Sequence, residues 1–312
     1  MTYLITGGAG SMGRQLTKYL LWDDEIDKII IFSRDEAKHA MMRQEIPDKR
    51  LRYIIGDVRD LDRITRACKG VDYVIHTAAL KRVPEGQYNP TEFIKTNIQG
   101  TENVISACAN TDVKRAVLLS TDKAVEAINL YGKTKAVAEE VWLQANIEYR
   151  PIYNVTRYGN VIGSTGSVVP FFKQLVEGGA TSLPVTWPNM TRFAMTFNDA
   201  VHLVMYALWS VYPQQIFVAK APSFSMVRLA QAFNCAMDIT GTRSGEKLHE
   251  VLVSKYESNR AYDYGDHYRI IPEDPYDDEI TFCDIEPMEA HTEYESYTNE
   301  DWLTVDDLRD LI

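Results

Sequence analysis

Short apolar runs alternate with amphipathic stretches through the first half of the chain. Apolar runs that end in turn residues are typical of buried parallel strands. We predict such strands at Tyr3–Thr6, Lys28–Phe32, Leu51–Ile55, Tyr73–His76, Ala116–Leu119 and Ile152–Thr156. Helical spacing predicts helices after Gly13, from near Asp60, and over Thr91–Cys108 and Tyr131–Ala145. Strands that alternate with helices indicate an α/β protein with a Rossmann-type, doubly wound parallel sheet.

The pattern changes after Arg157. The stretch Arg157–Phe172 is dense in Gly, Ser and Asn, which predicts a loop around a polar ligand, with Pro170 near a helix start. Further on, the amphipathic stretches Phe197–Tyr212 and Met226–Met237 predict helices. A strand is predicted between them, at Gln215–Ala219.

Two arginines of this second half lie among turn residues, in Met190–Phe193 and Thr242–Glu250. From Asp263 onward the chain is acidic and aromatic without clear periodicity, so we predict an irregular tail packed over the body. We therefore expect a dinucleotide-binding domain at residues 1–157 that includes the catalytic residues. A smaller α/β substrate-binding lobe and the tail follow at residues 158–312, with chain that can return to the first domain.

The composition argues against partners of two kinds, nucleic acids and membranes. The chain has 312 residues, of which 45% are hydrophobic, and a formal net charge of -11. Such a surface repels nucleic acid and anionic membranes, so we expect neither as a partner. No apolar run approaches the roughly 18–20 residues of a membrane span. The N-terminus lacks the pattern of a signal peptide, which predicts a cytoplasmic protein.

The four cysteines do not have the spacing of metal ligands, and we expect no metal site. Cys68, Cys108 and Cys235 lie in amphipathic patterns that predict buried thiols, and Cys283 has no such context. Unpaired cysteines fit a reducing compartment.

A glycine-rich turn follows the first predicted strand. Its sequence is GGAGSMG, with Gly7, Gly10 and Gly13 at intervals of three and a helical pattern behind them. Strand, glycine turn and helix together predict a dinucleotide site, because glycine allows the backbone to approach the pyrophosphate. The helix N-terminus then offers free N–H groups to that anion.

The end of the second strand bears on the choice of cofactor. An acidic residue at this point would bind the ribose hydroxyl of NAD, whereas this chain has Ser33 and Arg34. A hydroxyl and a guanidinium suit the 2′-phosphate of NADP, and Lys38 can assist. A solvated loop is the alternative, because Asp35 and Glu36 are adjacent.

Other strand ends add candidates with open alternatives. Asp57 either accepts from the adenine amino group or caps the next helix. The small residues of Thr77–Lys81 let backbone lie close to a ligand, and Lys81 either meets a phosphate or sugar or is solvated. His76 has the pattern of a packed histidine, and Asn97 that of a structural bridge to the active site. Ligands in such sheets bind at the carboxyl ends of the strands, where these residues gather.

Reactive side chains concentrate in the stretch Ser120–Lys135, after the fifth strand. Thr121, Asp122 and Lys123 are consecutive, and Tyr131 and Lys135 are four apart, which places them on one face of a helix. A cation beside a phenol lowers the pKa of the phenol. The stretch therefore combines a tyrosine base, a carboxyl acid and a lysine. The alternative for the Asp-Lys pair is a turn with a self-compensating charge pair.

These motifs resemble the extended short-chain dehydrogenase/reductases. The resemblance is sharpest to UDP-N-acetylglucosamine 4,6-dehydratases, in particular the short C5-inverting enzymes that open the pseudaminic acid pathway, and it covers nearly the whole chain. The segments that carry it are Gly7–Gly13, Ser33–Glu36, His76–Pro84, Ser120–Ala124, Ile128–Gly132, Arg157–Asn160, Ser167–Phe172, Gly245–Glu250 and Tyr297–Leu303.

The resemblance implies roles for individual residues. Asp122, Lys123 and Tyr131 occupy the catalytic positions, Lys135 is the partner of the tyrosine, and Thr121 assists. Together with the motifs above, it gives the residues expected at NADP: Gly7, Ala9, Gly10, Ser11, Met12, Gly13, Ser33, Arg34, Asp35, Glu36, Lys38, Asp57, Val58, Thr77, Ala78, Ala79, Lys81, Asn97, Tyr131, Lys135 and Val161. The residues expected at the UDP-sugar are Lys81, Asn160, Thr165, Gly166, Ser167, Val168, Arg192, Arg243 and Glu246.

The chain departs from the family pattern at a few positions. Thr165 stands where relatives often have arginine, Val125–Ala127 replaces Ala-Asn-Pro, and Thr77 replaces an alanine. The membrane-bound, retaining relatives carry methionine at the position of Tyr131, so the tyrosine favours the inverting branch. Relatives form dimers or hexamers, which implies a homo-oligomer here.

The expected reaction is dehydration of UDP-N-acetylglucosamine with NADP recycled at each turnover. A UDP-sugar 4-epimerase or an NADP-dependent reductase is the nearest alternative, because both keep Tyr131 and Lys135 without needing Asp122 and Lys123. A non-catalytic NADP-binding regulatory protein is a further alternative.

Overall fold

The computed structural model describes residues 1–273 and 285–312. Cys283 lies outside the described residues. Cys68 and Cys108 are buried thiols, as their sequence context predicts, whereas Cys235 is only half-buried.

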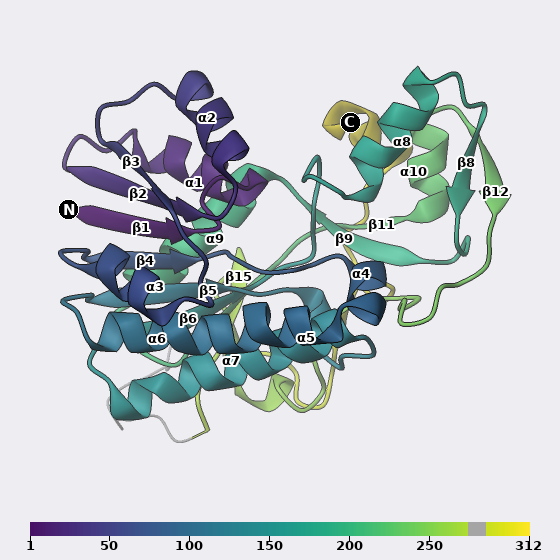
Figure 1. The fold of residues 1–312 in the computed structure, drawn as a ribbon. Coiled ribbons are helices and arrows are strands. Elements are labelled where there is room, and N and C mark those ends of the chain that lie inside the picture. Colours follow the sequence, from purple (N-terminus) through teal and green to yellow (C-terminus); the bar gives the residue numbers. More distant parts are fainter. Residues whose placement is uncertain (274–284) are drawn as a thin grey trace.

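A large twisted sheet forms the centre of the molecule (Figure 1). Six of its strands run parallel in the order β6-β5-β4-β1-β2-β3. The inner strands are mostly apolar because helices cover both faces, whereas β3 lies at the edge and is partly exposed. The predicted strands are confirmed as β1 (Thr2–Thr6), β2 (Lys28–Ser33), β3 (Leu51–Ile55), β4 (Tyr73–His76), β5 (Arg115–Leu119) and β6 (Ile152–Arg157). The order reverses between β1 and β4, which is where such sheets bind ligands.

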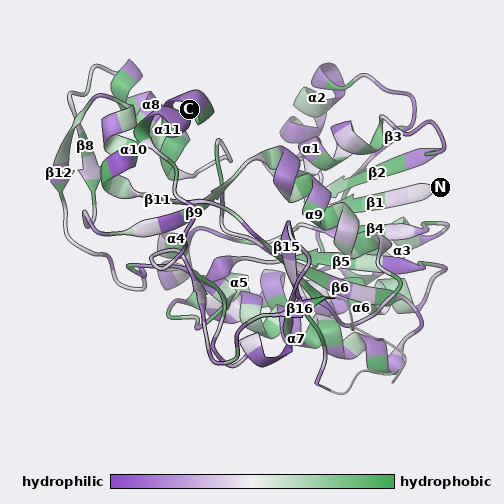
Figure 2. Cartoon of the chain, turned by 180° about the vertical axis from the view of Figure 1, so that it is seen from behind, coloured by the Kyte–Doolittle hydropathy of each residue, from purple (hydrophilic) through white to green (hydrophobic). Residues whose placement is uncertain are grey.

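Two layers of helices enclose the sheet (Figure 1). One layer contains α3 (Leu61–Cys68), α6 (Gly100–Ala109) and α7 (Leu130–Glu148). The other contains α1 (Ser11–Leu20), α2 (Glu36–Glu45) and α9 (Phe197–Trp209). The helices mix hydrophobic and hydrophilic residues, whereas central strands such as β2 are largely hydrophobic (Figure 2). The core therefore lies between the sheet and these helices.

The helix predicted over Thr91–Cys108 is interrupted. It consists of α5 (Pro90–Phe93), a π-helical turn (Ile94–Gln99) and α6, and α4 (Val83–Tyr88) precedes it. Phe93, Asn97, Gly100 and Val104 form one buried face at helical spacing through all three segments. Ile94, the residue after Phe93, lies outside this face and is 41% exposed.

The second half builds a smaller lobe with its own apolar cluster around Phe172, Leu183 and Phe224. Its strands are β7 (Asn160–Val161), β8 (Ser182–Val185), β9 (Thr191–Met195), β11 (Ser223–Ser225) and β12 (Ala236–Ile239). Its helices are α8 (Val168–Glu177), α10 (Met226–Ala232) and α11 (Val305–Leu311). Figure 1 shows this lobe beside the sheet, with α11 at the C-terminus packed on it.

Two predictions for this lobe were wrong. Met190–Phe193 is not a turn, because Thr191–Met195 forms the buried strand β9 between β7 and β11. The helix predicted to Met237 ends at Ala232, since Asn234 has a φ of 55° and the next residues pair with β8 as β12. Local apolar spacing does not reveal such pairing between distant strands.

The tail after Asp263 is also more regular than predicted. Its strand β15 (His267–Ile270) pairs antiparallel with β10 (Ile216–Ala219) and β14 (Ala261–Asp263), and β16 (Glu286–Pro287) extends the same sheet. Strand β13 (Val251–Val253) pairs with β17 (Tyr294–Glu295) beside the body. These strands are too short to show a period in the sequence. Within the described ranges, no helix has the length and apolarity of a membrane span.

Candidate active site

The glycine turn lies between β1 and α1. Gly7 has a φ of 64°, and a Cβ there would lie 2.7 Å from Thr77 Oγ1 and 2.9 Å from Ala78 N. Only glycine fits so close to the segment after β4. Gly10 caps α1, and no side chain of the described residues bonds to that helix start, so its first N–H groups stay available to an anion. A dinucleotide pyrophosphate fits this cradle.

The end of β2 presents Arg34 beside the glycine turn. Its side chain is half exposed and reaches Asp57 Oδ2 at 3.4 Å, while the Ser33 hydroxyl bonds to His39 Nε2 at 2.7 Å. Asp35 caps α2 by accepting from the Lys38 N–H at 3.0 Å, so it is a helix cap and Glu36 is the first helical residue. The solvated loop considered as an alternative is therefore a helix start.

Asp57 is held by arginine. Its Oδ2 lies 2.6 Å from Arg59 Nη2, and although burial opposes the charge, these hydrogen bonds hold the pKa of Asp57 below its usual value. The residue that caps α3 is Asp60, which accepts from Arg63 N at 2.9 Å. Val58 is buried, and a Cβ on Gly100 would lie 2.7 Å from Val58 Cγ2.

Asn97 bridges the loop after β4 to α7. Its Oδ1 accepts from Leu80 N at 2.8 Å, and its Nδ2 donates to Leu80 O at 2.9 Å and to Thr134 Oγ1 at 3.0 Å. This arrangement positions the backbone of Thr77–Lys81, with Lys81 itself exposed. His76 is buried between Thr6 and Thr101, so it is a packed strand-end histidine.

Asp122 is fully buried directly after β5. It begins a 3-10 turn (Asp122–Ala124), and its N–H bonds to Tyr158 O at 3.1 Å. Its Oδ1 accepts from Thr121 Oγ1 at 2.8 Å and from Lys123 Nζ at 3.0 Å. Its Oδ2 has no hydrogen-bond partner within the described residues. A Cβ on Gly159 would lie 3.5 Å from that oxygen and 2.7 Å from Phe193 Cβ, so the glycine lets the chain after β6 pass close to Asp122.

Tyr131 and Lys135 share the first turns of α7, which Asn129 caps by accepting from Gly132 N at 2.8 Å. Lys135 is buried and donates to Leu119 O at 2.8 Å. Burial lowers the pKa of Lys135 to about 8, against the attraction of Glu139. The pair thus stands beside the end of β5.

The expectation of a lowered tyrosine pKa was wrong. Burial raises the pKa of Tyr131 to about 12 and outweighs the opposing effects of Lys123 and of a hydrogen bond with Thr121. The pKa of Lys123 is also raised: burial lowers it, but the carboxylates of Asp122 and Glu250 outweigh burial. In this state the lysine carries a proton.

Glu250 is the residue that sequence reasoning missed. Its side chain is 2% exposed, and its Oε1 lies 3.2 Å from Lys123 Nζ and 3.7 Å from Arg192 Nε. Both Glu246 and Glu250 lie in the Gly245–Glu250 motif, and the resemblance implied a role for Glu246 alone.

Arg192 lies in β9 with its donors directed to protein carbonyls. It donates to Thr191 O at 2.7 Å and to Leu248 O and Lys247 O at 3.1 Å each. Glu246 lies 3.8 Å from the same guanidinium, and Arg243 is exposed on the loop before it. Arg192 therefore anchors the segment that carries Glu246 and Glu250.

The predicted sugar loop reaches the glycine turn. Thr165 Oγ1 lies 2.7 Å from Ser11 Oγ, so the two loops are bonded to each other. Gly166 has a φ of 78°, and Ser167 caps α8 before Val168. Asn160 and Val161 form β7 beside β9. The structure thus brings the candidate cofactor and sugar loops together.

The chain is similar to known enzymes of nucleotide sugars. Residues 3–272 match the family described as polysaccharide biosynthesis protein. The chain is 42% identical to a UDP-N-acetylglucosamine 4,6-dehydratase (inverting) of Campylobacter jejuni (serotype O:23/36, strain 81-176), over 99% of this chain and 96% of the relative. It is 41% identical to a UDP-glucose 4-epimerase of Rickettsia bellii (strain RML369-C), over 100% of this chain and 95% of the relative.

Solved structures share the fold. The X-ray structure of Pen from Bacillus thuringiensis superposes with a TM-score of 0.91 at 32% identity, over 100% of this chain and 96% of Pen. DesIV, a dTDP-glucose 4,6-dehydratase from Streptomyces venezuelae crystallised with NAD, has a TM-score of 0.73 at 23% identity, over 80% and 87% of the two chains. The chain therefore belongs to the polysaccharide biosynthesis protein family, with the fold of the extended short-chain dehydrogenase/reductases.

Proposed function

We propose that the chain is a nucleotide-sugar 4,6-dehydratase that converts UDP-N-acetylglucosamine to UDP-2-acetamido-2,6-dideoxy-hexos-4-ulose. The observation that carries the proposal is the pair Asp122 and Lys123. A buried carboxyl group, one oxygen of which has no protein partner among the described residues, lies beside a half-buried amine. Loss of water needs a base at C5 and an acid at the hydroxyl group of C6. Oxidation of an alcohol alone does not need this acid–base pair. The Campylobacter jejuni relatives support this assignment.

A nicotinamide dinucleotide fits the glycine turn and the neighbouring strand ends, and when bound it would accept hydride from C4 and return it to C6, so that the net reaction is loss of water. The half-exposed guanidinium of Arg34 supports NADP over NAD, because it suits a 2′-phosphate. Gly7, Gly10 and the start of α1 would hold the pyrophosphate, and Thr77–Lys81 would line the sugar side.

The chain's own groups account for the proton movements. Tyr131, as phenolate, takes the proton of the C4 hydroxyl, and Lys135 and Thr121 position it. Burial holds the pKa of Tyr131 at about 12, while Lys123 and the hydrogen bond with Thr121 oppose burial and favour the phenolate. Lys123 then takes the C5 proton while Asp122 gives its proton to the C6 hydroxyl. The C5–H and C6–O bonds break, a C5–C6 double bond forms, and water leaves. The acid and base forms arise by one proton transfer from Lys123 to Asp122 along their 3.0 Å contact.

The proposal also covers the stereochemistry at C5, the sugar site and the assembly of the enzyme. Reprotonation of C5 from the opposite face gives the inverted L-arabino product, and the word "inverting" in the names of the Campylobacter jejuni relatives supports it. Arg192, Arg243 and Glu246, with Asn160 and the 165–168 loop, form the predicted UDP-sugar site. A cytoplasmic homo-oligomer, dimer or hexamer, acting at the start of the pseudaminic acid pathway completes the proposal.

Purified protein with UDP-N-acetylglucosamine in heavy water tests the function. The expected product, followed by NMR, is a 4-keto-6-deoxy sugar with deuterium at C5 and no net NADPH. A product epimerised at C4 with its C6 oxygen intact would instead match the activity in the name of the Rickettsia bellii relative. NADPH that accumulates in step with product would indicate a dehydrogenase or reductase.

A further inference from the structure

Two buried carboxylates share one half-buried ammonium in this site. Lys123 Nζ lies 3.0 Å from Asp122 Oδ1 and 3.2 Å from Glu250 Oε1. Both carboxylates are almost wholly buried, and each retains one oxygen without a hydrogen-bond partner among the described residues. The proposed elimination uses Asp122 and Lys123 but gives Glu250 no part.

The position of Glu250 does not depend on Lys123. Its backbone N–H donates to Ser296 Oγ at 2.9 Å, and Ser296 N donates to Glu250 O at 2.8 Å. Ser296 is fully buried and lies 2.7 Å from Thr191 Oγ1, which fixes it against β9. Arg192, anchored by backbone carbonyls, faces the Glu250 carboxylate. The framework therefore holds a carboxylate at this point before any ligand arrives.

We propose that Glu250 is a positioning residue of the elimination step. Its Oε1 holds the amine of Lys123 by an N–H group, so that the neutral amine keeps its lone pair for the C5 proton. When the proton has moved, the same carboxylate faces the new ammonium. This inference rests on the proposed dehydratase function and adds a third residue to its acid–base pair.

The charged groups around Lys123 make the rate of the proposed elimination depend on pH. The carboxylates of Asp122 and Glu250 raise the pKa of Lys123 against burial, and Arg192 opposes them. The remaining titratable groups that face it are Tyr131, Lys81 and Lys247. Removing the Glu250 charge lowers the pKa of the lysine. A base must be unprotonated to act, so the acid limb of the rate moves to lower pH.

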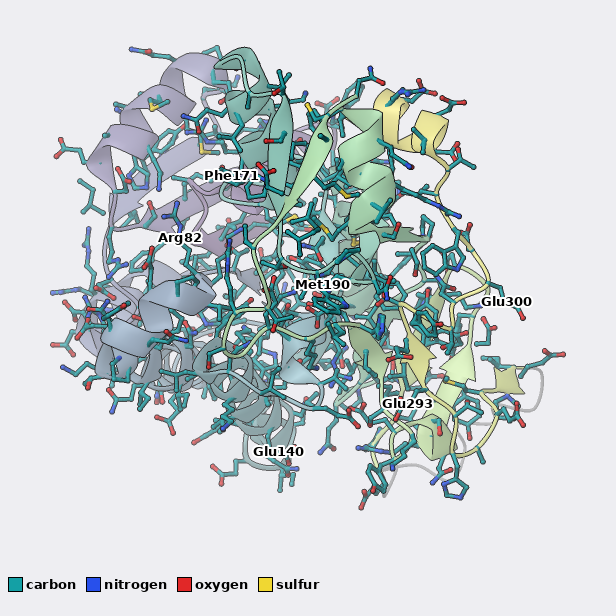
Figure 3. All side chains as sticks on the ribbon, turned by 90° about the vertical axis from the view of Figure 1, so that its right-hand side faces the viewer. Arg82, Glu140, Phe171, Met190, Glu293 and Glu300 are labelled. Carbon is teal, nitrogen blue, oxygen red and sulfur yellow. The ribbon has the colours of Figure 1, made fainter. Side chains whose placement is uncertain are left out.

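The test compares Glu250→Gln and Glu250→Asp with the wild-type holoenzyme. Dehydration and deuterium uptake at C5 are followed from about pH 6 to 10. In Glu250→Gln we expect kcat to fall at least about tenfold with an unchanged KM, and the acid limb to move down by about one pH unit or more. Glu250→Asp should keep the acid limb near its wild-type position with an intermediate kcat. The matched control is Glu293→Gln, because Glu293 is an exposed glutamate three residues before Ser296 (Figure 3). This variant should behave as wild type.

The opposing outcomes are distinct. An unmoved acid limb in an active, folded Glu250→Gln variant overturns the positioning role. If that variant does not fold, an acid limb that moves down by about one pH unit in Glu250→Asp, where the carboxylate remains, overturns the positioning role instead. Wild-type protein that does not dehydrate the sugar refutes the proposed function instead.

Discussion

Asp122 has different surroundings on its two oxygen atoms. Oδ1 accepts from Thr121 and Lys123, while Oδ2 is buried without a partner among the described residues and lies near Gly159. The bonded oxygen fixes the carboxyl group, and the other keeps its capacity for a hydrogen bond. Under the proposed function, the carboxyl group would hold its position by one oxygen and donate a proton from the other.

Replacing Asp122 by Asn keeps the shape and removes the acid. We expect dehydration to fall at least about 100-fold, because general-acid catalysis contributes this much or more. Oxidation at C4 should persist, seen as transient absorbance of reduced nicotinamide. Asp112→Asn, an exposed aspartate before β5, is the control. Unchanged turnover in Asp122→Asn would remove the residue from its role.

Lys135 is held at a cost in stability. Burial lowers its pKa to about 8 from a usual 10.5. The unfolded chain therefore binds more protons than the folded chain between those values, and stability rises with pH across that window. Below about pH 8 the buried ammonium costs about 3 kcal/mol, by the 2.5-unit difference between the two pKa values.

Replacing Lys135 by Met should abolish turnover yet raise the melting temperature at pH 7. The gain should shrink as the pH rises from about 8 to 10.5, because the wild-type lysine becomes neutral over that range. Melting curves across pH measure it, with Lys133→Met as the exposed control on the same helix. A constant difference at every pH would contradict the prediction.

The sequence predicted the site only as far as its residues are neighbours in the chain. Asp122 and Lys123 are adjacent, and Tyr131 and Lys135 are one helical turn apart, so local geometry brings them together. Glu250 meets Lys123 only through the fold, and no local pattern reveals that contact. The pKa of Tyr131 was mispredicted for the same reason, because burial dominates it.

At the scale of elements, α7 packs directly on the turn that carries Asp122 and Lys123. Gly132 makes this possible, because a Cβ there would collide with the backbone carbonyl oxygen of Lys123. The glycine therefore sets the distance between the tyrosine helix and the acid–base pair.

Gly132→Ala should force the turn away from α7. We expect a loss of about 1–3 kcal/mol in the free energy of unfolding, as for other overpacked sites, and a drop in kcat. Chemical denaturation and turnover measure the two effects. Gly86→Ala is the matched control, because its Cβ would sit 3.5 Å from Phe93 in ordinary contact. Equal behaviour of the two variants would argue against the close approach.

Elements differ in how well the sequence predicted them. The six parallel strands are short runs rich in apolar residues, most of them covered on both faces, and the sequence located all six. The strand β9, the π-helical turn and the strands of the tail were missed because their structure depends on distant pairing or on a local change of helix period. Strand β9 is fully buried, and Met190 just before it lies in the interior of the molecule (Figure 3).

On the scale of the whole molecule, the C-terminal helix completes the smaller lobe. Leu308 of α11 is fully buried in the apolar cluster with Leu229 and Phe224. The end of the chain thus stabilises the lobe that carries the predicted sugar loop.

Leu308→Ala should reduce the free energy of unfolding by about 2–4 kcal/mol, the usual range for a buried leucine. Binding of UDP should weaken more than binding of NADP, because the lobe and not the glycine turn is loosened. Calorimetric titration with each ligand measures this difference. Asp310→Ala, exposed on the same helix, should change neither. Equal weakening of both ligands would contradict a local role for α11.

The hydrogen bonds between Ser296 and Glu250 also bear on biosynthesis. A ribosome that adds about 5–20 residues per second needs roughly 10–35 seconds to pass from Lys123 to Ser296. During that time the nascent chain has the strands of the large sheet up to β6. It still lacks Ser296, which holds the backbone of Glu250 beside Lys123. Lys123 is thus synthesised well before the segment that braces Glu250 beside it.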